Sequence, residues 1–184
     1  MDELGTFEER DGAATLRFER VYPRPIETVW SAMTQPERMA DWLGVSELEP
    51  RVGGAVRLFT DREAAAQVHG RVLEWEPPRV LAFTWVAHDE PETVVRAELS
   101  EAGEGATRLV FTHAGVPRKW LALTLPGWHQ LLERLGVRLR ENRVEPDGME
   151  RWRELQADYL RRYDLSGADV DPPLPPETYE SPGR

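Results

Sequence analysis

The stretch PGWHQLLERLGVRLRE, residues 126–141, decides the fold because it predicts the long helix around which the domain is built. Its apolar residues recur at the three- and four-residue spacing of one helical face: Trp128, Leu131, Leu132, Leu135 and Leu139. Pro126 stands where the first turn of a helix tolerates proline. An apolar helical face of this length needs a large apolar partner, and the preceding segments supply one.

Strand-like alternation of polar and apolar residues dominates the chain before this helix. It occurs in seven segments: 14–22, 45–48, 55–60, 68–75, 80–86, 93–100 and 107–113. Most are joined by short turns, which favours antiparallel neighbours over crossover connections. Two short helices, 26–34 and 36–43, follow the first strand. We therefore expect an α+β fold in which a curved antiparallel sheet wraps around a long C-terminal helix.

Changes of composition divide the chain into four parts. Residues 1–12 are expected to be a flexible N-terminus and residues 13–140 the folded domain. Residues 141–163 combine a polar linker with an extra amphipathic helix that carries Trp152, Leu155, Tyr159 and Tyr163 on one side. Residues 164–184 form an acidic, proline-rich tail with little to bury, and we expect it to be disordered.

Charge and composition exclude several classes of function. The net charge is −10 and no basic stretch stands apart from acidic neighbours, which argues against nucleic-acid partners and anionic membranes. The chain has no cysteine, which excludes disulfides and thiolate zinc sites. It shows neither a secretory signal at its start nor an apolar run long enough to span a membrane. We expect a cytoplasmic protein.

Four segments resemble a known family. The runs are VYPRPIETVWSAMTQPERMADWLG (21–44), GRVLEWEPPRVLAFTW (70–85), TRLVFTHAGVP (107–117) and GWHQLLERL (127–135). Together they resemble the START-like, or SRPBCC, superfamily, in particular its bacterial branch related to the activator of heat shock protein 90 ATPase. The resemblance covers about residues 13–140. It implies the helix-grip fold (START-like, Bet v-like), with a cavity between the sheet and the last helix. The superfamily includes lipid carriers, hormone receptors, polyketide cyclases and co-chaperone domains.

Aromatic residues and two histidines are the candidates for lining such a cavity, because ligand cavities are mostly apolar with a few placed polar groups. The candidate ligand-binding residues are Trp42, Phe59, Phe83, Trp85, Phe111, His113, Trp128, His129 and Leu132. Strand alternation puts His113 on the same face as Phe111, so His113, His129 or Arg71 would orient a polar end of the ligand. The alternative is that these side chains fill a core and that His113 bonds to nearby groups.

Motifs for catalysis or metal binding are missing. No two histidines have the spacing of a helical metal site, no GxSxG occurs, and Gly53-Gly54 and Gly103/Gly105 are turn residues. The sequence thus predicts no catalytic residue, metal or cofactor.

Three functions stay in competition. The first is binding of a small apolar, aromatic or lipid-like molecule in the cavity. The second is a co-chaperone or protein-interaction module, or self-association, through residues 141–184. The third is a cyclase- or aromatase-like enzyme with a cavity histidine as general base. The sequence favours the binding protein over the enzyme. Convergence of two or more ionisable side chains in the cavity would support the enzyme, whereas a solid interior would count against binding.

Overall fold

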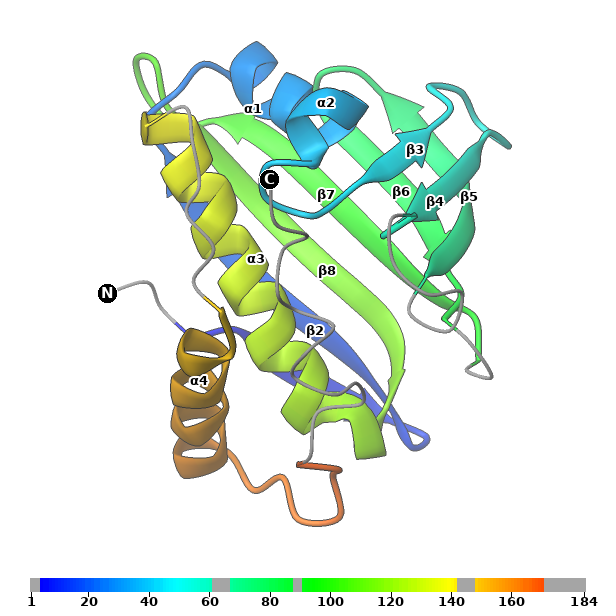
Figure 1. The fold of residues 1–184 in the computed structure, drawn as a ribbon, viewed down its shortest axis with the longest axis vertical. Coiled ribbons are helices and arrows are strands. Elements are labelled where there is room, and N and C mark those ends of the chain that lie inside the picture. The colour runs from blue at the N-terminus through cyan, green and yellow to red at the C-terminus, as the bar shows by residue number, and fades with distance from the viewer. Residues whose placement is uncertain (1–3, 61–66, 88–90, 142–147, 171–184) are drawn as a thin grey trace.

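One antiparallel sheet of eight strands forms the body of the protein (Figure 1). The computed structural model describes residues 4–60, 67–87, 91–141 and 148–170. The strands are β1 (Thr6–Arg10), β2 (Ala13–Tyr22), β3 (Ser46–Leu48), β4 (Ala55–Leu58), β5 (Val68–Glu76), β6 (Val80–Trp85), β7 (Thr93–Glu101) and β8 (Thr107–Pro117). Their order across the sheet is β1-β2-β8-β7-β6-β5-β4-β3.

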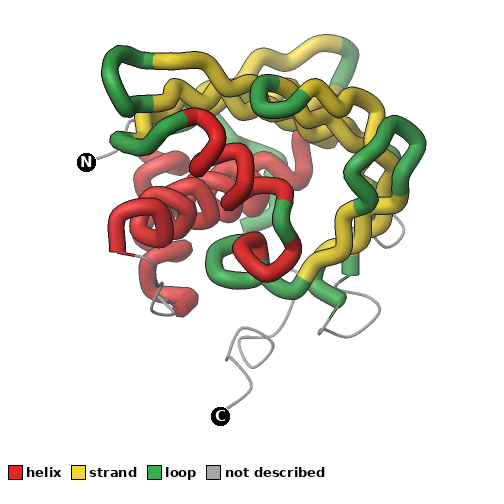
Figure 2. Tube along the Cα trace, turned by 90° about the horizontal axis from the view of Figure 1, so that it is seen from above, coloured by secondary structure: helices red, strands yellow, loops and turns green. Residues whose placement is uncertain are grey.

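The helices gather on one side of this sheet. They are α1 (Ile26–Thr34), α2 (Pro36–Met39), the 3₁₀ helix η2 (Arg118–Trp120), α3 (Leu121–Glu141) and α4 (Gly148–Arg162). Figure 2 shows the sheet arching over them, with α3 beneath the concave face. The predicted curved sheet around a long helix is confirmed. No helix in the described ranges is long and apolar enough to cross a membrane.

Alternation along the central strands explains which face became concave. In β2, Leu16 and Phe18 are buried while Arg17 and Glu19 point to solvent. Phe18 lies directly opposite Phe111 of β8, and the two rings meet edge to face at 6.3 Å. Because side chains alternate between faces, each such pair adds an apolar layer toward α3.

The start of the chain differs from the sequence prediction. The sequence predicts a flexible N-terminus over residues 1–12, but residues 6–10 form β1 and pair with β2. The turn between them contains Asp11 and Gly12 at positive φ, and Asp-Gly is a typical hairpin pair. The strand was missed because its residues are mostly exposed, so it lacks apolar alternation. Its one partly buried side chain, Phe7, packs against the ring of Tyr163, with ring centroids 5.2 Å apart.

The long helix also begins earlier than predicted, at Leu121 instead of Pro126. A proline inside a helix leaves the carbonyl four residues earlier without its usual partner, here that of Ala122. Gln156 of α4 supplies the missing donor, with its side-chain nitrogen 3.0 Å from the Ala122 oxygen. A residue from another helix therefore makes Pro126 tolerable there.

The second short helix is shorter than predicted. The sequence predicts a helix over residues 36–43, but α2 ends at Met39 and turns continue to Leu43. Trp42 and Leu43 are nevertheless buried in the core.

Helix α4 lies where the sequence predicts an extra amphipathic helix, and it packs on α3 of its own domain. Trp152, Leu155 and Tyr159 on its apolar side are buried. The segment after it stays on the domain as far as it is described: Leu165 is buried and the amide of Asp169 donates to the carbonyl of Lys119 at 2.7 Å. The sequence predicts disorder over residues 164–184, and this is wrong for residues 164–170, which these contacts hold on the domain. Residues 171–184 of the predicted tail fall outside the described residues.

Candidate functional site

The space between sheet, α3 and the first two helices contains a small apolar cavity. Every described side chain that lines it is apolar: Met33, Met39, Trp42, Leu43, Leu48, Val56, Leu58, Leu81, Phe83, Val95, Ala97, Phe111 and Trp128. Its volume is about 20 Å³, room for about one water molecule. Pockets for drug-sized ligands measure roughly 300–1,000 Å³, so this cavity is too small in the present conformation to hold such a ligand. The predicted ligand cavity stays a prediction.

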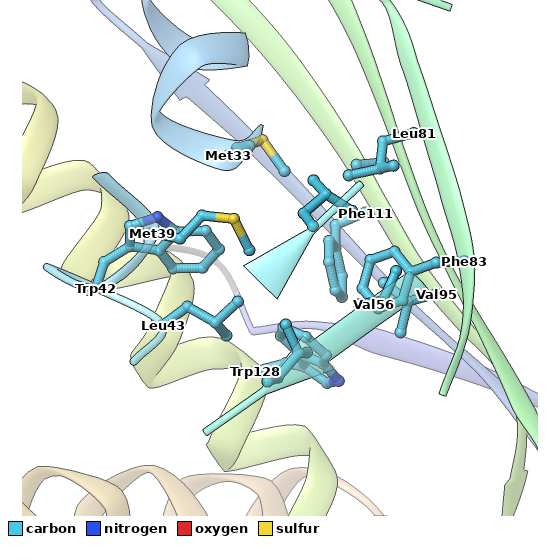
Figure 3. A pocket seen from close by; sticks show the side chains of 13 residues that line it. Met33, Met39, Trp42, Leu43, Val56, Leu81, Phe83, Val95, Phe111 and Trp128 are labelled. Atoms are coloured by element: carbon cyan, nitrogen blue, oxygen red, sulfur yellow. The ribbon is translucent and has the colours of Figure 1, made fainter. Parts of the chain in front are cut away.

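Side chains of the first two helices and side chains of the sheet and α3 face one another across this cavity (Figure 3). Residues 26–44, here called the cover segment, contribute Met33, Met39 and Trp42 on one side. Phe111 of the sheet and Trp128 of α3 lie opposite, with their ring centroids only 4.4 Å apart. Methionine is unbranched and adapts to different shapes, whereas two aromatic rings packed between the sheet and α3 are held in place more rigidly. The cover segment is therefore the adaptable wall.

Trp42 ties this wall to the rest of the cover segment. Its indole Nε1 donates to the carbonyl oxygen of Ala32 in α1 at 2.9 Å, and its ring is buried. The hydrogen bond satisfies the polar atom of Trp42 outside the cavity. Only apolar surface is left to face the space inside.

His113 lies behind Trp128 and does not line the cavity. The indole Nε1 of Trp128 donates to His113 Nδ1 at 2.9 Å, so Nδ1 accepts and the proton sits on Nε2. Nε2 in turn lies 2.7 Å from the Thr93 hydroxyl, which donates to the carbonyl of Trp85 at 3.1 Å. Both ring nitrogens of this buried histidine are thus occupied.

This environment sets the chemistry of His113. Burial disfavours the charged ring and lowers the pKa of His113 to about 3. A neutral imidazole with both nitrogens bonded inside the protein cannot take a proton from a bound molecule at neutral pH. Through its Nδ1 it holds the indole of Trp128 by a hydrogen bond. The prediction of His113 as a polar contact in the cavity therefore finds no support in this geometry.

His129 points away from the cavity, toward α4. Its Nδ1 lies 3.0 Å from the hydroxyl of Tyr159, and its Nε2 lies 3.4 Å from a carboxylate oxygen of Glu133. Arg151 of α4 holds the same carboxylate through two contacts of 2.6 and 2.9 Å. The hydroxyl of Tyr159 also accepts the amide of Gly5 at 2.7 Å. These polar groups join α3, α4 and the start of the chain.

Opposing effects act on Glu133 in this cluster. Burial alone raises the pKa of its carboxyl, but the nearby His129 ring and the two hydrogen bonds from Arg151 outweigh it and bring the pKa to about 2. The carboxylate is therefore charged at neutral pH and pairs with Arg151. The cluster has the character of a docking contact for α4, and it does not open onto the apolar cavity.

The structure brings together part of the predicted ligand set. Four of the predicted residues line the cavity: Trp42, Phe83, Phe111 and Trp128. Phe59, Trp85 and Leu132 are absent from its described lining and pack in the surrounding core. Phe59 and Trp85 meet edge to face at 6.3 Å.

Sequence reasoning missed the aliphatic part of the lining. The missed residues are Met33, Met39, Leu43, Leu48, Val56, Leu58, Leu81, Val95 and Ala97. Strand alternation carried a usable signal for some of them, since Leu81 shares a face with Phe83 and Val95 with Ala97. Across the described ranges, no group of three or more His, Cys, Asp or Glu side chains could hold a metal ion.

Comparison with known proteins agrees with this architecture. The family described as Activator of Hsp90 ATPase homolog 1-like protein matches residues 23–140. No protein of curated function matches the sequence. The crystal structure of CalU16 from Micromonospora echinospora is similar over 85% of this chain and 94% of that chain, with 27% identity and a TM-score of 0.68.

Two further solved structures differ in what their descriptions state. DynU16, a protein in the dynemicin biosynthetic locus, is 27% identical with a TM-score of 0.63, over 73% of this chain and 49% of that chain. An HSP90 activator from Plasmodium falciparum is 20% identical with a TM-score of 0.58, over 70% of this chain and 96% of that chain. The latter likeness concerns the fold alone.

Proposed function

Because the chain belongs to the family of Activator of Hsp90 ATPase homolog 1-like proteins, we propose that it binds a small apolar or aromatic, lipid-like molecule between the sheet and α3. The observation that carries this proposal is the uninterrupted apolar lining contributed by the cover segment, the sheet and α3. The likeness to DynU16, which belongs to a biosynthetic locus, adds support for a small-molecule role.

Binding requires the cavity to enlarge from its present volume. Met33 and Met39 are the side chains that can move at least cost, because each can change rotamer without breaking a hydrogen bond. The driving force is the burial of apolar ligand surface, at about 0.8 kcal/mol for each methylene group removed from water. A ligand must therefore be apolar along most of its length. Only then does its burial offset the free energy of enlarging the cavity and the translational and rotational entropy that the ligand loses on binding.

The enzyme hypothesis has less support from the same geometry. A cyclase-like mechanism needs an ionisable side chain in contact with the substrate, and every described side chain that lines the cavity is apolar. His113 is neutral and fully bonded behind Trp128, and His129 faces α4.

The protein-interaction hypothesis loses one of its two arguments. The amphipathic helix that motivated it buries its apolar side on α3, so this side is not available to a partner. The other argument, the acidic tail, concerns residues 164–184, of which only 164–170 are described.

Methyl NMR of methionine-labelled protein tests the binding proposal directly. The chain has four methionines, of which Met33 and Met39 line the cavity and Met149 lies on α4. On titration with naphthalene or 1-decanol, we expect the Met33 and Met39 methyl signals to shift and the Met149 signal to stay in place. Fluorescence of Trp42 and Trp128 should change in parallel, since both rings border the cavity.

A pair of matched variants sharpens this experiment. Met39→Ala removes a side chain from the lining and should increase affinity for the probe, whereas Met149→Ala removes the same side chain from α4 and should leave affinity unchanged. If neither the wild type nor Met39→Ala shows shifts confined to the cavity methyls at probe saturation, the proposed function is wrong.

A further inference from the structure

A second and larger pocket lies outside the core, beside the C-terminal end of α3. Its described lining is Arg24, Thr28, Ala32, Arg38, Arg138, Leu139 and Arg140, and its volume is about 260 Å³. These residues come from the segment before α1, from α1, from α2 and from the last turn of α3. Figure 1 shows these elements meeting at one end of the molecule, where α1 and α2 lie next to the end of α3.

The four arginines of this pocket differ in whether their guanidinium groups already have hydrogen-bond or ion-pair partners. Arg24 donates through Nε to the carbonyl of Leu139 at 2.8 Å and through Nη2 to the carbonyl of Arg140 at 3.3 Å, so it caps α3. Arg138 pairs with the carboxylate of Asp41. Arg38 and Arg140 are exposed, and neither guanidinium has a hydrogen-bond or ion-pair partner in the described ranges.

Capping of the helix does not account for this concentration of charge. Cations near the negative end of a helix dipole are favourable, and Arg24 with Arg138 meets that need. Arg38 comes from α2 and belongs to another helix, yet it faces the same hollow. The chain as a whole carries a net charge of −10. The lining of this pocket, in contrast, contains four arginines, of which Arg138 pairs with Asp41. The lining of this pocket is therefore richer in positive charge than the protein as a whole.

We propose that this pocket binds a small organic anion with two or more negative charges, either a phosphate ester or a polycarboxylate. Planar guanidinium groups bind both kinds of oxyanion through paired N–H donors. The volume of about 260 Å³ lies below the range of pockets for drug-sized ligands, which indicates a small molecule. Arg38 and Arg140 bind the anion directly, Thr28 offers a hydroxyl, and Arg24 and Arg138 supply fixed positive charge.

This site is separate from the apolar cavity. Thr28 and Ala32 of α1 line the basic pocket, whereas Met33 lines the apolar cavity. One helix therefore forms part of both walls with different faces. Anion binding here therefore does not depend on ligand binding in the apolar cavity.

Isothermal titration calorimetry of the full chain with pyrophosphate and with citrate, at matched ionic strength, tests the proposal. We expect one of the two probes to bind with one-to-one stoichiometry. Binding of pyrophosphate identifies the phosphate-ester class and binding of citrate the polycarboxylate class. In the double variant Arg38→Gln/Arg140→Gln, the affinity should fall roughly tenfold or more, because two charged donors are lost.

A matched double variant separates a site from general attraction. Arg10→Gln/Arg153→Gln removes the same charge from exposed positions on β1 and α4, outside the described lining of the pocket. Its affinity should stay within about twofold of the wild type, since exposed distant charges are largely screened. Thermal unfolding of each variant checks that it folds. Failure of both probes to bind the wild type, or an equal loss in the two double variants, would overturn the proposal.

Discussion

The buried His113 makes the stability of the protein depend on pH in a way that can be measured. Its folded-state pKa of about 3 lies below the ordinary value of 6.5. The fold keeps this histidine neutral, whereas the unfolded chain lets it take up a proton below about pH 6.5. Falling pH therefore favours the unfolded chain. The contribution of neutral His113 to the free energy of unfolding is therefore complete above pH 6.5. It is lost progressively as the pH falls from 6.5 to about 3.

The size of this effect follows from linkage. Between its two pKa values, one such group reduces the free energy of unfolding by up to about 1.4 kcal/mol per pH unit. From pH 7.5 to pH 4.5 the loss adds up to roughly 2.5–3 kcal/mol. The hydrogen-bond partners of the ring in the described part of the chain, Thr93 and Trp128, are both neutral, so neither compensates the charge.

The assay is urea denaturation followed by tryptophan fluorescence at several pH values between 7.5 and 4.5. The comparison protein is His113→Gln, which cannot titrate in this range and keeps a donor toward Thr93. Carboxylates titrate in both proteins, so their contribution cancels in the difference. The wild type should lose the extra 2.5–3 kcal/mol worked out above. Parallel pH profiles for the two proteins would refute the assignment of a neutral, buried His113.

Three other substitutions probe the contacts that hold the fold. Tyr159→Phe leaves the buried amide of Gly5 without its acceptor, and we expect a loss of about 1–3 kcal/mol in urea denaturation with faster hydrogen exchange at that amide. Gly70→Ala would place a Cβ 1.7 Å from a carbonyl oxygen of β6, so thermal unfolding should show a loss of about 2 kcal/mol or more. Gln156→Ala removes the donor that satisfies the Ala122 carbonyl, and we expect a loss of about 1–2 kcal/mol by urea denaturation. A wild-type value for any of them would contradict the corresponding contact.

The fold could be predicted wherever one face of a strand or helix is buried and the other is not. Leu16 and Phe18 in β2 alternate with charged residues, so periodicity alone identified the strand and its buried face. Residues 6–10 show no alternation because four of the five are polar and exposed, and the contact of the fifth, Phe7, is with Tyr163, far along the chain. The true start of α3 was hidden for a similar reason, since the partner that makes Pro126 acceptable is Gln156 of α4.

The candidate site was predictable only in part. Phe111 and Trp128 were identified because large aromatic residues on the concave face and on the helix must meet. Alternation placed His113 correctly on the same face as Phe111, yet its position relative to the cavity depends on where α3 crosses β8. Which of the residues of α1 face the cavity likewise depends on tertiary packing, and so Met33 was missed.

The hydrogen bond from the amide of Gly5 to the hydroxyl of Tyr159 joins residues 154 positions apart. It can form only late in the synthesis of the chain. At synthesis rates of 5–20 residues per second, roughly 8–30 s pass before the ribosome has added the residue that secures the first strand. During that time β1, which is an edge strand of the sheet, is not yet held by this bond, and its outer edge is exposed to pairing with other nascent chains. Its exposed charges Glu8, Glu9 and Arg10 are the kind of residue that discourages such pairing. The polar character that concealed this strand therefore protects it while the chain is still growing.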